Sequence, residues 1–96
     1  MYRDDPLDDE EELRAILGNE AVEALVGARD DLAGDPVEVA LDTLRVLQGW
    51  VEDDAAGRWF HRPQGRLDDR TPVVALVDGE FDEVLDAARA WAAANG

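Results

Sequence analysis

Residues able to carry covalent or acid–base chemistry are few in this chain. It contains one histidine, His61, no serine and no cysteine, and Thr43 and Thr71 are its only small hydroxyl side chains. A nucleophile, a base and a third group that orients the base cannot be assembled from this set. The lack of cysteine also removes disulfides, thiolate nucleophiles and cysteine-based metal sites. We therefore expect no enzymatic activity, no catalytic residue, no cofactor and no metal.

Carboxylates are abundant but select no reaction. With 24 acids in the chain, neighbouring pairs such as Asp68 and Asp69 arise by chance and indicate no acid–base pair. No loop has the ligand spacing around a central glycine that a calcium site requires. No glycine-rich loop of the phosphate-binding type occurs either.

A short basic segment is more informative. Arg58, Arg62 and Arg66, together with His61, lie in a stretch without acids that ends at Asp68. Guanidinium groups bind carboxylates in a fork geometry, so this segment could contact an acidic partner. The alternative is that these arginines pair with the protein's own acids and lie over apolar surface. His61 is expected to be a loop residue rather than a ligand or a base.

The tryptophans and phenylalanines are expected to lie mostly in the core. Trp91 differs because it is close to the C-terminus, on a helix that could extend beyond the domain. An exposed tryptophan there would be a suitable interface anchor. The aromatic residues considered are Trp50, Trp59, Phe60, Phe81 and Trp91.

An ordered set of residues runs through about the last half of the chain: a tryptophan near a helix end, a turn with proline, a leucine, a proline-led apolar block and a glycine before the last helix. This order resembles the toxin-binding domain of the Xre/MbcA/ParS antitoxin family. The glycines that usually follow the leucine are Asp68 and Asp69 here, so we expect that turn to be built differently. The matching residues are Trp59, Pro63, Leu67, Arg70, Pro72, Leu76, Gly79 and Val84.

The resemblance implies a function and a site. It implies the antitoxin of a type II toxin–antitoxin pair, which neutralises a RES-domain, NAD-consuming toxin by covering its active site with the C-terminal helix and tail. The loop 58–70 would then be a supporting contact or a homodimer surface. Removal of residues 92–96 is expected to weaken neutralisation without unfolding the domain. The residues expected to bind the toxin or another partner are Arg58, Arg62, Arg66, Arg70, Phe81, Arg89, Trp91, Asn95 and Gly96.

Two other functions stay open. One is an acidic helical adaptor or regulatory protein that binds a basic protein or assembles with itself. The other is an autoregulating transcriptional regulator, because relatives in the family often repress their own operon. Residues 1–50 carry 4 arginines against 14 acids, and residues 51–96 carry 5 against 10. Contact with phosphates needs a basic face, so the charge disfavours direct DNA binding, although the family permits it.

Length and composition favour one soluble domain. The chain has 96 residues, of which 46% are hydrophobic and 34% charged. Its net charge is −15, and all nine basic residues are arginine. This acidity fits a high-salt cytoplasm, a GC-rich genome or, as a third option, an acidic mimic of nucleic acid. Neither a signal peptide nor an apolar run of about twenty residues is present, so we expect a cytoplasmic protein without a membrane span.

Apolar spacing and capping residues predict an all-α fold, a single compact domain of five to six short helices. Composition alone would favour a strand over residues 73–77, but a lone short strand has no partner. Thr71 and Pro72 fit the N-cap and first position of a helix, as the resemblance also implies. By function, residues 1–57 form a helical part without a clear helix-turn-helix and residues 58–96 the antitoxin-like region. The expected helices are about 8–17, 19–32 capped by Asn19, 36–51 bent at Gly49, 55–60, 72–77 and 81–93.

Overall fold

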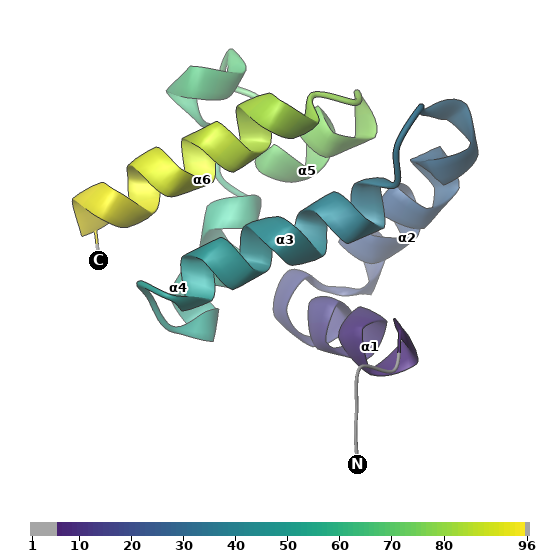
Figure 1. The fold of residues 1–96 in the computed structure, drawn as a ribbon, viewed down its shortest axis with the longest axis horizontal. Helices are drawn as coiled ribbons and strands as arrows, with labels where there is room; N and C mark the ends of the chain where they lie inside the picture. Colours follow the sequence, from purple (N-terminus) through teal and green to yellow (C-terminus); the bar gives the residue numbers. More distant parts are fainter. Residues whose placement is uncertain (1–5, 96) are drawn as a thin grey trace.

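Helices account for the whole regular structure of the computed structural model, which describes residues 6–95 (Figure 1). Apart from an isolated bridge between Gln64 and Arg70, no strand occurs in this range. The all-α prediction is confirmed. The elements are α1 (Pro6–Leu17), α2 (Asn19–Ala28), the 3-10 turn η1 (Arg29–Asp31), α3 (Pro36–Gln48), α4 (Asp53–Phe60), the 3-10 turn η2 (Gly65–Leu67), α5 (Pro72–Val77) and α6 (Phe81–Asn95).

Capping side chains explain where α3 and α5 begin. The Asp35 carboxylate accepts a hydrogen bond from the backbone N–H of Val37 at 2.9 Å. The Thr71 hydroxyl accepts one from the backbone N–H of Val74 at 3.3 Å. In each case proline takes the next position, where its missing N–H costs no intrahelical hydrogen bond. The prediction of a short helix rather than a strand over residues 72–77 is therefore confirmed.

Three predicted helix details are wrong. Gly18, with φ 97°, is the N-cap of α2, so Asn19 is the first helical residue and its side chain makes no capping hydrogen bond. Since glycine adopts this left-handed backbone without strain, α1 and α2 join with almost no loop. α2 also ends before Leu32, which is extended. α3 ends at Gln48 with Gly49 as its C-cap, so Gly49 terminates the helix rather than bending it.

Helix α3 is the centre of the fold and contacts all five other helices, as its broad apolar face predicts. Its most extensive contact is with α6, which runs beside it in the same direction (Figure 1). At the start of this pair, Gly34 lies against the ring of Phe81; a Cβ added at Gly34 would be 2.7 Å from that ring. The radius of gyration of 12.5 Å matches the value of roughly 12–13 Å for one domain of this length. The predicted boundary at residue 57 falls inside α4.

The aromatic residues divide by depth. Trp59 and Phe60 are completely buried and form an edge-to-face pair with ring centroids 5.3 Å apart. Phe81 and Trp91 are half-buried at the edge of the core. Trp50 is 57% exposed, so the expectation that it lies in the core is wrong. Because α3 ends at Gln48, Trp50 lies in the turn beyond the helix, where the apolar stripe no longer fixes its direction.

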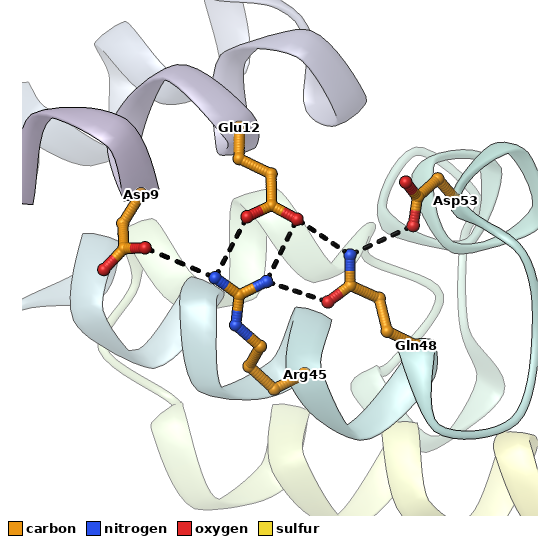
Figure 2. Close-up of polar contacts among 5 residues, drawn as sticks. All are labelled: Asp9, Glu12, Arg45, Gln48 and Asp53. Carbon is orange, nitrogen blue, oxygen red and sulfur yellow. Dashed lines mark hydrogen bonds and ion pairs between the residues drawn. The ribbon is translucent and has the colours of Figure 1, made fainter. Parts of the chain in front are cut away.

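A polar cluster joins α1, α3 and α4, and Figure 2 shows its five members. Both terminal nitrogens of Arg45 bond the Glu12 carboxylate at 3.0 Å, and one of them lies 3.3 Å from Asp9. The Gln48 amide donates to Glu12 and to Asp53, each at 3.0 Å. Hydrogen bonds from Arg45 and then Gln48 hold the pKa of Glu12 below its usual value. We call Asp9, Glu12, Arg45, Gln48 and Asp53 the Arg45 cluster.

Candidate functional site

The fold brings together two of the acid-free segments of this chain. They are residues 55–67 and residues 87–95, in a chain where acids make up 24 of 96 positions. The 3-10 turn η2 of the first segment packs on α6, which carries the second. Residues of both segments line two shared surface hollows. We call this surface the acid-free face; its members are Arg58, Arg62, Gln64, Gly65, Arg66, Ala87, Ala90, Trp91 and Ala94.

Trp91 stands at the middle of the acid-free face. It forms a wall of a hollow of about 180 Å³, which Arg58 and Arg62 also line. It also borders a second hollow of about 340 Å³, which contains Arg66 and three alanines of α6. The indole therefore borders two hollows, one lined by Arg58 and Arg62 and the other by Arg66.

Trp91 contacts two groups of the protein, the buried Trp59 ring and the side chain of Asn95. Its ring lies 6.3 Å, centroid to centroid, from that of the buried Trp59. One turn further along α6, the Asn95 side-chain amide donates to the Trp91 carbonyl at 2.8 Å. The indole N–H of Trp59 is buried and, within the described residues, has no acceptor. A buried donor without an acceptor is uncommon in folded proteins.

The arginines separate into two groups. Within residues 9–95, Arg58, Arg62 and Arg66 are exposed and make no ion pair, whereas each of the other arginines in this range makes at least one. The ion pairs with the protein's own acids that the alternative expects for Arg58, Arg62 and Arg66 are therefore not found within residues 9–95. Arg70, which follows Asp68 and Asp69, does form such pairs. Its guanidinium contacts Asp78 at 3.0 Å and also bonds the Glu80 carboxylate.

Arg70 therefore serves the fold. Its Nε–H donates to the Leu67 carbonyl at 2.9 Å, and its backbone pairs with Gln64 to close the loop 64–70. The hydrogen bond from Arg70 lowers the pKa of Glu80. Hydrogen bonds to Glu80 and then to Asp78 raise the pKa of Arg70. Arg70 thus stabilises the loop 64–70 and does not line the hollows of the acid-free face.

Of the other predicted partner-binding residues, Phe81 and Arg89 also lie away from this face. Phe81 packs on Gly34 at the opposite end of α6. Arg89 is two positions from Trp91, so it points to nearly the opposite side of the helix, and it lies 3.4 Å from Asp86. Asn95 lies next to the face, and Gly96 is outside the described residues. The structure brings together Arg58, Arg62, Arg66, Trp91 and Asn95.

Sequence reasoning missed the alanines that surround Trp91. Ala87, Ala90 and Ala94 line the larger hollow with Trp91, at positions that follow the i, i+3, i+4, i+7 spacing of one helix face. The signal that could have identified them is the lack of any acid after Asp86. Ala87 is buried, whereas Ala90 is partly exposed and Ala94 exposed, so their small side chains leave the end of the helix open to close approach.

His61 and the motif residues have structural roles. His61 is the C-cap of α4, and its Nε2–H donates to the Leu17 carbonyl at 2.5 Å, so its prediction as a loop residue is confirmed. Asp68 and Asp69 have φ values of 58° and 65°. This left-handed backbone is the one that glycine favours, and the expectation that the turn is built differently from that of the family stays a prediction. Among the motif residues, the buried ones are Trp59, Leu67, Pro72, Leu76 and Val84.

No protein-family model, curated protein or solved structure matches this chain. In the range 6–95, no group of three or more histidine, aspartate or glutamate side chains is placed to hold a metal ion. None of the helices described there combines the length and apolar character needed to cross a bilayer.

Proposed function

We propose that this chain is the antitoxin of a type II toxin–antitoxin pair, and that it neutralises a RES-domain toxin through the acid-free face and the end of α6. The observation that supports this function is the position of the ordered residues. Trp59 lies in the last turn of α4, Pro72 opens α5, and Gly79, with φ 86°, precedes α6. These are the positions that the family resemblance implies for them.

The end of α6 suits the inhibitory role. Ala93, Ala94 and Asn95 are exposed, and Ala94 and Asn95, three and four positions after Trp91, lie on the same side of the helix as Trp91. Ala92 is completely buried, so a deletion that includes it would remove part of the core. That removal of residues 92–96 leaves the domain folded stays a prediction, and a deletion that spares the buried Ala92 begins at Ala93.

Co-expression with the adjacent open reading frame tests the proposal. We expect the neighbour alone to arrest growth and to drain intracellular NAD, and this chain to restore both. Deletion from Ala93 onward should weaken rescue at an unchanged melting temperature, while Arg89→Gln should rescue fully. A harmless neighbour, or a poisonous one that this chain does not affect, would count against the antitoxin function.

A second candidate function is an acidic adaptor for a basic protein. A groove of about 330 Å³ between α1 and α3 favours it, because Val37 and Leu41 lie there among acids that include Asp9, Glu10 and Glu38. If the neighbouring gene is harmless, binding of a basic partner that is lost in Glu38→Arg would support this alternative.

A further inference from the structure

We infer that the acid-free face recognises carboxylate groups of an acidic protein surface in the two hollows that Trp91 borders, with small or apolar partner side chains lying over Ala90 and Ala94 of α6. This inference deepens the proposed function, since it rests on the chain acting through a protein partner. It does not require that the partner be a toxin.

The side chains that line the smaller hollow favour a ligand that accepts hydrogen bonds. The side-chain polar groups of its lining residues belong to Arg58, Arg62, Trp59 and Trp91. Guanidinium and indole groups are donors only. A ligand that fills this hollow must therefore supply acceptors, and the planar fork of arginine is best matched by a carboxylate.

The larger hollow, which Trp91 also borders, favours a carboxylate for the same reason. Arg66 lies at this side of Trp91, and the remaining wall is the alanine face of α6. An aromatic anchor between charged donors is typical of interface hot spots. A partner with acids flanking a small apolar patch would meet both hollows at once.

The distribution of charge explains why these arginines are available. The chain carries −15 overall, and most of its other arginines are held by nearby carboxylates. An acid placed within residues 55–67 or 87–95 could capture Arg58, Arg62 or Arg66 in the same way. Keeping both segments free of acids leaves the three guanidinium groups open to a carboxylate from another molecule.

Protein carboxylates fit this face better than nucleic acid does. A phosphate backbone presents regularly spaced charges and needs a basic surface that follows it. Here three unpaired arginines are bounded in the sequence by Asp54 and Asp68, and the remainder of the chain repels a long polyanion. A compact acidic patch avoids that repulsion.

Selection from a displayed library of random linear peptides on the immobilised full chain tests the inference. Although a protein of charge −15 should attract basic peptides, we expect peptides rich in Asp and Glu with an apolar residue among them. Affinity of a selected peptide should fall at least about tenfold in Arg58→Gln/Arg62→Gln/Arg66→Gln, the scale of a lost charged hydrogen bond. The variant should keep the wild-type melting temperature, because these arginines are exposed and unpaired.

Arg89→Gln is the matched control, since it removes an exposed arginine from the other side of α6 and should leave peptide affinity unchanged. The inference is overturned if the selected peptides lack acids, or if the triple variant binds them as well as the wild type. Tighter binding of a single-stranded oligonucleotide than of the acidic peptides would also overturn it. These outcomes do not depend on the growth assay, so each proposal can fail without the other.

Discussion

Arg45 and Arg62 are both exposed arginines near α4, yet their surroundings are opposite. Arg45 bonds Glu12 and contacts Asp9 within the Arg45 cluster, which joins three helices (Figure 2). Arg62 lies on the acid-free face and makes no ion pair within residues 9–95. In a chain with 24 acids, a nearby carboxylate is the ordinary surrounding of an arginine. The exclusion of acids, more than the presence of arginines, therefore marks the candidate site.

Helix α4 connects the two regions. Asp53 at its start belongs to the Arg45 cluster, and Gly57 in its middle lies against α1. Arg58 and Arg62 at its end belong to the acid-free face. The packing of α4 on α1 therefore sets where two of the three unpaired arginines are presented.

The largest expected loss of stability concerns Trp59, the buried residue whose ring contacts that of Trp91. Trp59→Ala should lower the free energy of unfolding by about 3–5 kcal/mol, because it leaves a cavity where a completely buried indole stood. Trp91→Ala should cost less than half as much, since Trp91 is only half-buried. Urea unfolding of both variants measures the difference. Equal losses would mean that Trp91 belongs to the core rather than to the binding surface.

The contact between α1 and α4 gives the next effect. A Cβ added at Gly57 would lie 2.6 Å from the backbone oxygen of Ile16, so Gly57→Ala should force the helices apart and destabilise the protein by about 1–3 kcal/mol. Gly27→Ala is the matched control in α2, where a Cβ meets nothing within 4 Å. It should stabilise by about 0.5–1 kcal/mol through helix propensity. Thermal unfolding that moved both variants in the same direction would contradict this packing.

A third prediction compares the arginines themselves. Arg45→Gln should lower stability by up to about 1 kcal/mol, because the exposed Arg45 cluster is screened by solvent. Arg62→Gln should change stability by less than about 0.5 kcal/mol while weakening partner binding. Chemical denaturation and peptide binding, measured on the same two variants, separate the roles. A stability loss in Arg62→Gln as large as that in Arg45→Gln would remove the distinction between the two regions.

The smallest predicted effect is a pH dependence of the Arg45 cluster. The pKa of Glu12 is lowered in the folded protein, chiefly by the hydrogen bond from Arg45. Its stabilising contribution is therefore present above the unfolded-state pKa and is lost as pH falls through the lower folded-state pKa. Below the usual glutamate pKa near 4.5, the melting-temperature difference between wild type and Glu12→Gln should shrink. If this melting-temperature difference stayed constant down to acid unfolding, the folded structure would not favour the charged form of Glu12, and the lowered pKa would be contradicted.

Much of the helical framework follows from local sequence because its determinants are only a few residues apart. Asp35-Pro36 and Thr71-Pro72 start helices through side-chain caps and a fixed proline φ, which do not depend on distant residues. The broad apolar face of α3 likewise predicts a central helix, since such a face must be covered from several sides. The end of that helix was predicted less well, and Trp50 was placed in the core although it is exposed.

Which arginines pair with a carboxylate, and which do not, depends on the folded structure. Arg58, Arg62 and Arg70 lie close together in the sequence, but Asp78 and Glu80 contact Arg70 alone. Residues 55–67 and 87–95 are separated in the sequence by α5 and the beginning of α6, and they meet because both α4 and α6 pack on α3. Caps and spacing act over a few residues, whereas ion pairing and the joining of surface segments depend on the folding of the whole chain. The helices and the lack of acids in these two segments therefore follow from local sequence, whereas folding joins the segments into one face around Trp91.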